Sequence, residues 1–189
     1  MKKILLLSLV LAAAIPASLL GATWAIDGAH SNINFKISHF TLSRVTGSFG
    51  SFDGTLQFDP EKPEEASADI TVQIASINTG NAKRDDHLNQ NDFFDSSSFP
   101  VATFKSTKWT PTGDNTYEIE GELTMLGKTL PVTLDATLVG VVDTPRGTSS
   151  GWEASTTIDR YDWGIGEKSG ASVGRKVDLE INVAAFKQS

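Results

Sequence analysis

The sequence predicts an all-β fold, most simply an antiparallel barrel of eight strands with one short helical segment. Apolar and polar residues alternate with period two along most of the chain, as they do in strands with one buried face. About eight such segments can be recognised, the number that closes a small barrel. The segment at residues 129–140 is longer than most strands of globular proteins. Long, tilted strands fit a barrel better than a sandwich.

The first residues are expected to lie outside this fold. Lys2 and Lys3 precede an apolar run at residues 4–15, and small residues follow the break at Pro16. This order is typical of a secretory signal peptide, with cleavage after Ala22. The run is short for a membrane span, and a membrane-anchored N-terminus is the alternative. We expect residues 1–22 to be a signal peptide and residues 23–189 to form one domain.

The charge of the chain restricts its partners. Residues 23–189 hold 14 Lys and Arg against 23 Asp and Glu, a net charge of −9. An acidic chain without a basic stripe is a poor binder of nucleic acids and of anionic membrane surfaces. The chain contains no Cys, which excludes disulfides and a thiol nucleophile. We therefore expect no nucleic-acid partner and no stable membrane insertion.

The expected strands alternate between an inward and an outward face. The inward positions are Ile33, Phe35 and Ile37; Ala68, Ile70, Val72 and Ile74; Tyr117, Ile119, Gly121 and Leu123; Leu130, Val132, Leu134, Ala136 and Leu138; Trp152, Ala154, Thr156 and Ile158; and Val177, Leu179, Ile181, Val183 and Ala185. Two more strands are expected near residues 45–58 and 101–109.

The connections between these strands carry residues typical of turns. A tight turn is expected at Leu126-Gly127, and Pro, Gly and Asp punctuate the segments at 59–60, 111–115 and 145–147. Gly47, Gly50 and Gly54 interrupt one strand. Glycines inside a strand pattern predict bends or bulges, which a closing barrel needs.

One segment, residues 81–100, differs from the strands around it. It combines Arg84, Asp85 and His87 with Phe93 and Phe94. Asn81 suits the N-cap of a short helix. Its apolar side chains can face inward while its charged side chains meet water. The segment is therefore expected to cover one end of the barrel.

No catalytic or metal-binding constellation is evident. The three His are His30, His39 and His87, and the chain has no nucleophile elbow and no HExxH motif. Asp85, Asp86 and His87 could supply one or two metal ligands, but no second cluster completes a site. The Gly164-Ile165-Gly166 stretch is better explained as a strand connection than as a phosphate loop. We expect no catalytic residue, no metal and no cofactor.

The pattern alone leaves open whether the barrel is filled or hollow. Small residues share the inward face with large ones, which could leave room for a ligand. They are Ala68, Gly121, Ala136, Gly140 and Ala154. A filled barrel would instead suit an interaction module that binds through exposed residues such as Trp109.

Six segments resemble one known family in their order and spacing. They are "WAIDGAHSNINFKISHF", "VTGSFGSFDGTLQFD", "INTGNAKRDDHLNQNDFFD", "FPVATFKS", "GELTMLGKTLPVTL" and "DRYDWGI", spanning Trp24 to about Phe186. The family is that of the YceI-like, lipocalin-like periplasmic polyisoprenoid-binding proteins. The resemblance implies a lipocalin-like eight-stranded barrel with a short helical lid, located in the periplasm. It also implies a long apolar channel for an isoprenoid chain or a similar amphiphile.

On this basis we expect the protein to bind or carry a long-chain amphiphile, such as an isoprenoid quinone or a polyprenyl lipid, and not to be an enzyme. A homodimer is compatible with this prediction, and a filled-barrel interaction module or a lipid-modifying enzyme is the alternative. The expected ligand-binding residues are Ile33, Phe35, Ile37, Phe40, Phe49, Phe52, Ile70, Val72, Arg84, His87, Leu88, Phe93, Phe94, Phe104, Leu123, Leu134 and Trp163. Arg84 or His87 is expected to meet a polar head group; alternatively, Arg84 and a neighbouring Asp only fix the covering segment.

Overall fold

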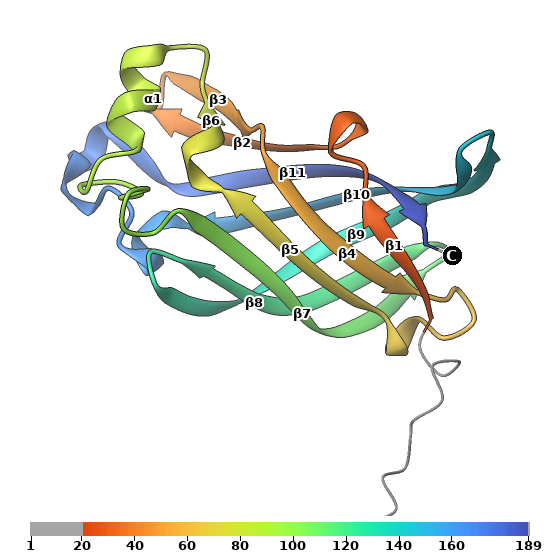
Figure 1. Cartoon of the computed structure of the whole chain (residues 1–189). Coiled ribbons are helices and arrows are strands. Elements are labelled where there is room, and N and C mark those ends of the chain that lie inside the picture. Colours follow the sequence, from red (N-terminus) through yellow and green to blue (C-terminus); the bar gives the residue numbers. More distant parts are fainter. Residues whose placement is uncertain (1–20, 189) are drawn as a thin grey trace, which may run out of the picture.

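The computed structural model describes residues 21–188, which form an elongated antiparallel β-structure (Figure 1). The expected signal peptide lies outside the described residues except for Gly21 and Ala22. Ala22, its expected last residue, begins the first strand.

Within residues 21–188 the chain forms eleven strands and one α-helix. The strands are β1 (Ala22–Ile26), β2 (Asn32–His39), β3 (Ser43–Phe49), β4 (Phe52–Phe58), β5 (Ser67–Gln73), β6 (Ile77–Asn78), β7 (Val101–Gly113), β8 (Thr116–Met125), β9 (Lys128–Thr144), β10 (Gly147–Asp159) and β11 (Val173–Lys187). The helix is α1 (Ala82–Leu88), and short 3₁₀ segments lie at Gly28–His30, Pro63–Glu65, Ile74–Ser76, Arg160–Trp163 and Glu167–Ser172.

Eight of the strands form a closed ring. Their order is β1-β4-β5-β7-β8-β9-β10-β11, and β1 pairs back onto β11. Each neighbouring pair is antiparallel. The predicted all-β, eight-stranded antiparallel barrel is therefore confirmed.

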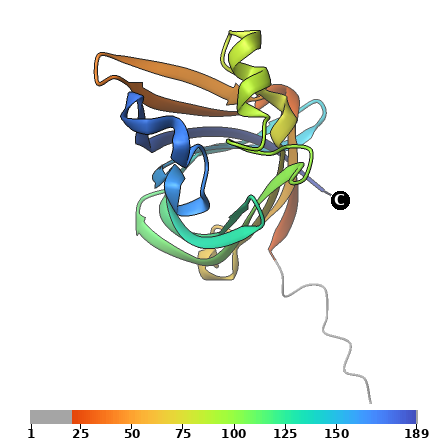
Figure 2. The ribbon, with the colours of Figure 1, turned by 90° about the vertical axis from the view of Figure 1, so that its left-hand side faces the viewer.

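The other three strands extend the barrel at one end only. β2 pairs with β11, β3 with β2, and β6 with β3. β2, β3 and β6 lie next in the chain to β1, β4 and β5, so they prolong three neighbouring strands of the ring. The β2–β3 hairpin stands clear of the ring at this end (Figure 2).

The wall is not closed by strand pairing beyond β5 and β7. Their pairing ends at Gln73 opposite Val101, and within residues 21–188 β6 has no pairing with β7. Residues 79–100, with α1, cross the barrel at this point (Figures 1 and 2). We call this region the α1 end, comprising residues 38–45, 79–100, 125–128 and 159–176. The opposite end, where β1 closes the ring, is called the β1 end.

Only the first part of the covering segment is helical. The Asn81 side chain accepts a hydrogen bond from the backbone N–H of Arg84 at 3.1 Å, which confirms the expected N-cap. The helix ends at Leu88, where Asn89 to Asn91 follow. Asn has a low helix propensity because its side chain competes for backbone hydrogen bonds. The remaining residues up to Pro100 form turns.

The β1 end of the barrel is filled by aromatic side chains. Phe58 lies edge-on to Trp152, with ring centroids 4.8 Å apart, and to Tyr117 at 5.7 Å. Trp109 lies edge-on to Trp152 at 5.6 Å, and Trp24 belongs to the same buried cluster. Such edge-to-face pairs add to the free energy gained by burying the rings. We call these five residues the aromatic plug.

The position of Trp109 differs from the expectation. The filled-barrel alternative expects Trp109 to be an exposed binding residue. In the structure only 3% of its surface is exposed. Its indole N–H donates to the Ser106 hydroxyl at 3.1 Å. A bulge between Ser106 and Lys108 shifts the register of β7 and helps to set which β7 side chains face inward.

Replacing Phe58 with Ala should remove the centre of the aromatic plug. We expect the free energy of unfolding to fall by about 3–5 kcal/mol, because a large buried ring leaves a cavity. Urea unfolding followed by tryptophan fluorescence measures this change. Val142→Ala is the control, because Val142 is 60% exposed, and it should change stability by less than about 0.5 kcal/mol. A similar small effect of both substitutions would contradict the plug.

Candidate functional site

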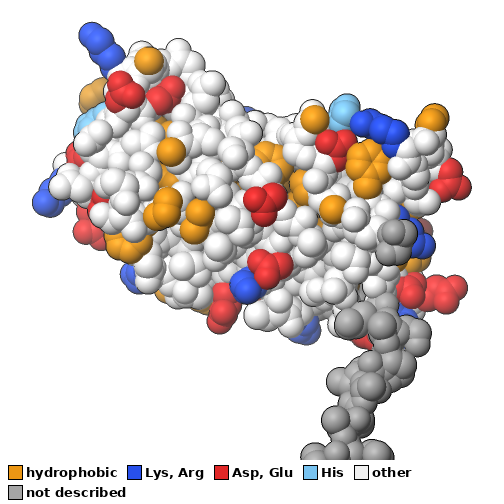
Figure 3. Space-filling model, in the orientation of Figure 1, with side chains coloured by type: hydrophobic (Ala, Val, Ile, Leu, Met, Phe, Trp, Pro, Cys, Tyr) orange, Lys and Arg blue, Asp and Glu red, His pale blue; other side chains and the backbone are white. Residues whose placement is uncertain are grey.

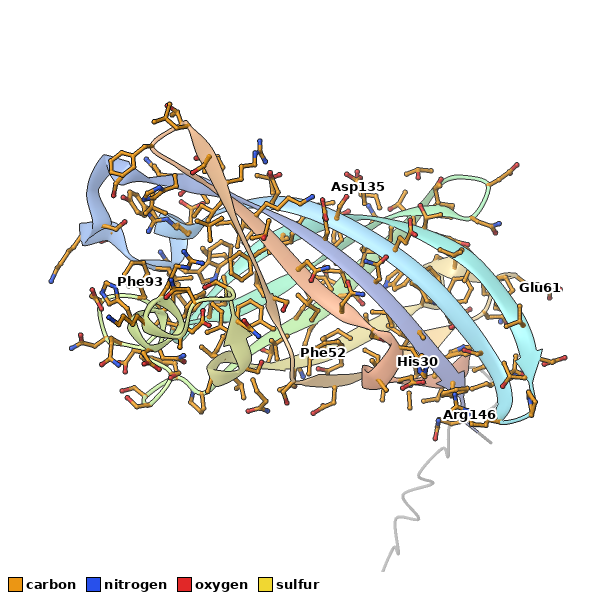
Figure 4. The ribbon with its side chains drawn as sticks, turned by 90° about the horizontal axis from the view of Figure 1, so that it is seen from above. His30, Phe52, Glu61, Phe93, Asp135 and Arg146 are labelled. Atoms are coloured by element: carbon orange, nitrogen blue, oxygen red, sulfur yellow. The ribbon has the colours of Figure 1, made fainter. Side chains whose placement is uncertain are left out.

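A cavity of about 650 Å³ occupies the barrel between the aromatic plug and α1. Its wall is mainly apolar and comes from strands on all sides of the barrel and from residues 79–100. Ile26 and Val183 line it toward the β1 end, and Phe93 lines it at the α1 end, where Figure 4 shows Phe93. The interior is thus filled in one half and hollow in the other.

The cavity opens at the α1 end. Three of the residues that line it are exposed to solvent, and all three lie at that end: His87, Asp92 and Lys168. Ser38, His39, Thr79, Ser169 and Ser172 add further polar groups there. The deep wall is apolar apart from Thr156. An amphiphile could therefore place its tail inside and its polar group at the opening.

Fifteen of the seventeen expected ligand-binding residues line this cavity. They are Ile33, Phe35, Ile37, Phe49, Phe52, Ile70, Val72, Arg84, His87, Leu88, Phe93, Phe94, Phe104, Leu123 and Leu134. The structure thus brings together side chains from seven strands and from residues 79–100. Their role in binding stays a prediction.

Phe40 and Trp163 do not line the cavity. Phe40 lies in the β2–β3 turn with 58% of its surface exposed, and its positive φ of 50° takes it out of the strand alternation. Trp163 follows β10 in a 3₁₀ turn and packs among Met125, Val132 and Ile165. Its indole N–H donates to the carbonyl of Leu123 at 3.1 Å. It therefore supports the wall from a neighbouring layer.

Several lining residues were not among the expected ligand-binding set. Some occupy inward strand positions that the alternation had indicated: Ile74, Val132, Thr156, Ile158, Val177, Leu179, Ile181 and Val183. Others, such as Ile165, Lys168, Ser169 and Ser172, come from the connection between β10 and β11. That connection carries no periodic pattern, so the sequence contained no signal for its position over the cavity.

Two glycines keep aromatic rings against the cavity wall. A Cβ atom on Gly47 would lie 2.7 Å from Phe35 Cε1, and one on Gly121 would lie 2.5 Å from Phe104 Cε2. These distances are too short for real atoms, so each ring lies where a side chain would otherwise stand. The pairing of β2 with β3 passes through Gly47 without a register shift, so the bulge expected there is absent. Gly47 instead lets the Phe35 ring lie against the bare backbone, which leaves the lumen open.

Arg84 and Asp85 tie the covering helix to the end of β6. Arg84 Nε donates to the Thr79 hydroxyl at 2.7 Å, and its Nη2 donates to the Thr79 carbonyl at 2.9 Å. The Asp85 carboxylate accepts from the Thr79 backbone N–H at 2.9 Å. Both side chains therefore bond to Thr79 rather than to each other. This supports the interpretation that they fix the segment, although Arg84 also borders the cavity.

His87 belongs to the rim of the opening. Its Nε2 lies 2.9 Å from an Asp92 carboxylate oxygen, and its ring lies edge-on to Phe93 at 4.9 Å. The pair links the helix to the turn that follows it. His30, by contrast, lies at the β1 end (Figure 4), where it contacts Asp27 at 2.7 Å. The structure does not bring these two His together.

Arg160 organises the connection that borders the cavity on the side of β10 and β11. It is 3% exposed, and its guanidinium donates five hydrogen bonds, including those to the carbonyls of Ile165 at 2.6 Å and Gly174 at 2.8 Å. All five acceptors are uncharged oxygens. Burial lowers the pKa of Arg160 from its ordinary value, but an arginine stays protonated in proteins. The five hydrogen bonds from Arg160 hold residues 165–174 together on this side of the cavity.

Asp159, the residue before Arg160, holds the start of this connection. Burial alone would raise the pKa of its carboxyl, but the hydrogen bond from Arg175 and the charges of Arg175 and Lys176 lower it overall. Arg175 Nη2 lies 2.8 Å from the carboxylate. Asp159 also accepts from the backbone N–H of Tyr161 at 3.1 Å. It thus caps the turn that carries Arg160.

Residues 21–188 contain neither a cluster of metal ligands nor a helix that could span a membrane. In this part of the chain no three His, Asp or Glu side chains are close enough together to hold a metal ion. None of its helices has the length and apolar character needed to cross a membrane.

Comparison with known proteins shows what this barrel resembles. A family model described as the YceI-like domain matches residues 24–185. A UPF0312 protein of Vibrio cholerae is 35% identical over 192 residues, covering 100% of both chains. The crystal structure of BcnA from Burkholderia cenocepacia is 27% identical, with a TM-score of 0.79, covering 85% of this chain and 99% of that one.

A more distant structure shares the fold alone. It is described as a polyisoprenoid binding domain from Saccharophagus degradans implicated in plant cell wall breakdown, and it is 14% identical to this chain. The TM-score is 0.67, and the match covers 88% of this chain and 99% of that one.

Replacing Gly121 with Ala should narrow the cavity. The new methyl group would lie 2.5 Å from Phe104 Cε2 and 2.7 Å from the carbonyl oxygen of Lys105, so the β7 backbone must shift and the Phe104 ring must turn into the lumen. We expect the affinity for an apolar fluorescent dye to fall by about tenfold, the effect of 1–2 kcal/mol of overpacking. Gly140→Ala is the control, because a Cβ there meets nothing within 4 Å. Equal dye affinities of the two variants would show that Gly121 does not keep the lumen open.

Replacing Arg160 with Gln should loosen the connection between β10 and β11. Several buried carbonyls would lose their donors, so we expect the free energy of unfolding to fall by at least about 2 kcal/mol. Arg44→Gln is the matched control, since the Arg44 side chain is 63% exposed in its ion pair with Asp178, and it should cost less than about 1 kcal/mol. Urea unfolding measures both, and equal losses would contradict the role given to Arg160.

Proposed function

The chain belongs to the YceI-like family, and we propose that it binds a long-chain amphiphile in the cavity at the α1 end. An isoprenoid quinone or a polyprenyl lipid is the class of ligand that fits best. The observation that carries this proposal is the half-hollow barrel, with its apolar cavity of about 650 Å³. This volume lies within the usual range for small-molecule sites.

The wall favours a flexible apolar chain over a rigid polar ligand. Its deep part is made of Phe, Ile, Val and Leu side chains. Each methylene group removed from water contributes roughly 0.8 kcal/mol, so ten of them contribute roughly 8 kcal/mol before the entropic costs of binding. Affinity can therefore come from the tail alone. Selectivity among tails should be modest and depend on length and shape.

The polar part of the ligand belongs at the opening. Arg84, His87 and Lys168 lie there, and each can donate a hydrogen bond to a carbonyl or phosphate oxygen. Arg84 is already engaged with Thr79 and His87 with Asp92. We infer that these groups orient a head group and that the apolar wall provides most of the affinity.

We propose a binding or carrier role in the periplasm rather than catalysis. Two charged groups of the cavity wall hold the neighbouring segments in place: Arg84 bonds to Thr79 and Arg160 to the carbonyl of Ile165. The expected signal peptide supports export. The structural neighbour described as a polyisoprenoid binding domain and the family resemblance of the sequence support the ligand class.

Native mass spectrometry of the protein isolated from its own cells tests the proposal, with organic extraction of whatever is bound. We expect a long-chain species that also rebinds to the stripped protein. A clean apo mass, with no uptake of prenyl quinones or fatty acids when they are offered, would overturn the proposal.

A variant in which a large side chain fills the cavity gives a more specific test. Thr156 lines the cavity, whereas its neighbour Ser155 is exposed on the outer face. We expect Thr156→Trp to lose at least about tenfold in affinity for the extracted ligand, because the indole takes the space of the tail. Ser155→Trp should bind as the wild type does. Equal binding by the two variants would place the ligand outside the cavity.

A further inference from the structure

The turn between β2 and β3 has an unfavourable sequence for its backbone conformation. Phe40 and Thr41 both have positive φ, 50° and 58°, and Leu42 N–H donates back to the His39 carbonyl at 3.1 Å. Tight hairpin turns of this kind favour Asn and Gly at the two central positions. The β8–β9 turn follows that preference at its second position, with Leu126 and Gly127. The bulky Phe and the β-branched Thr in the β2–β3 turn therefore cost the protein stability.

The same turn exposes two large apolar side chains. Phe40 is 58% exposed and Leu42 is 89% exposed. The hairpin that carries them projects from the body of the barrel at the α1 end (Figures 2 and 4). We call Phe40, Thr41 and Leu42 the hairpin tip. Leu42 gains little from the fold, and Phe40 makes an edge-on ring contact with its neighbour His39 at 4.5 Å. The exposed apolar surface that remains suggests that these side chains contact something else.

The hairpin tip stands beside the opening of the cavity. Its Phe40 N–H donates to the carbonyl of Ser172 at 2.7 Å. Ser172 and Val173 line the cavity, and so does His39 just before the tip. Below α1, further hydrophobic side chains reach the surface at the same end (Figure 3), and Phe99 and Val101 are 36% and 37% exposed. Apolar groups are thus exposed at two places toward this end of the molecule.

The charges of the molecule separate along the barrel. The α1 end holds eight Lys and Arg against seven Asp and Glu, whereas the rest of residues 23–189 holds six against sixteen. Residues 28–52, which include the whole β2–β3 hairpin, contain no Asp or Glu. The excess of negative charge therefore lies in the body and the β1 end, which together carry a net charge of −10. An anionic surface would repel that part and leave the α1 end facing it.

We propose that the hairpin tip docks onto the surface of a phospholipid bilayer, with the opening of the cavity toward the membrane. This inference rests on the proposed function, because an amphiphile that lives in a bilayer must enter and leave there. Phe40 and Leu42 insert between the lipid head groups, while Arg44 and Lys168 lie at the level of the phosphates. The contact is transient, since two side chains provide a small apolar area. It differs from the stable insertion that the sequence argues against.

The absence of Cys from the chain allows a direct test with single labels. Leu42→Cys and Val142→Cys each receive an environment-sensitive fluorophore. Val142 is 60% exposed near the β9–β10 hairpin at the β1 end. A label there reports on the end that should not touch the membrane. With vesicles of phosphatidylethanolamine and phosphatidylglycerol, we expect the label at position 42 to brighten several-fold and the label at position 142 to stay unchanged.

Co-sedimentation with the same vesicles tests the two apolar side chains. Phe40→Ser combined with Leu42→Ser should lower the bound fraction by about tenfold, because both side chains lose their apolar contact. Val139→Ser combined with Val142→Ser removes exposed apolar groups at the β1 end and should have no effect. No response of label 42, an equal response of both labels, or a loss confined to the valine variant would overturn the proposal.

Two further measurements separate this proposal from its rivals. If label 42 brightens with protein concentration in the absence of vesicles, the tip binds a second copy of the chain and the membrane proposal fails. Binding of a fluorescent fatty acid without vesicles tests the cavity independently in each variant. Retained fatty-acid binding without vesicle docking would refute this inference alone. If the wild-type protein binds neither the fatty acid nor a prenyl quinone, the proposed function is refuted.

Discussion

The pairing of β1 with β11 is the constraint on which the rest of the structure depends. It closes eight strands into a ring at one end, so no strand there has a free edge. At the other end β6 and β7 are not paired within the described residues, and residues 79–100 cross between them. The barrel thus has one end closed by strand pairing and one end covered by a segment held through Arg84 and Asp85. This asymmetry gives the cavity its direction.

The two halves of the interior have different tasks. The aromatic plug packs large rings against one another and supplies a compact core at the closed end. That core allows the other half to stay hollow, although a cavity normally costs stability. Gly47 and Gly121 keep the lumen open by letting Phe35 and Phe104 lie against the wall. Arg160 then fixes the connection that borders the opening, through bonds to neutral acceptors alone.

These features of the YceI-like barrel are consistent with the proposed binding of an amphiphile. The apolar wall suits a tail, and the polar rim suits a head group. The hairpin tip lies beside the rim and places exposed Phe and Leu side chains where the molecule is least acidic. The opening, the proposed head-group contacts and the proposed contact with a bilayer all lie at one end. A ligand could therefore pass between bilayer and cavity without crossing the acidic body.

The strands, their inward faces and the capped helix could be predicted because each depends on local patterns. Period two identifies which side of a strand is buried, and Asn81 marks a helix start from its own side chain. The sequence thus indicated fifteen residues that line the cavity. It misplaced Phe40, because a turn with positive φ breaks the alternation, and Trp163, because a 3₁₀ turn has no period of two. Alternation also cannot tell a filled interior from a hollow one, since both require apolar side chains. Tertiary structure decided that difference through contacts between distant strands, which gather the rings of Trp24, Phe58, Trp109, Tyr117 and Trp152 at one end and leave the other end open.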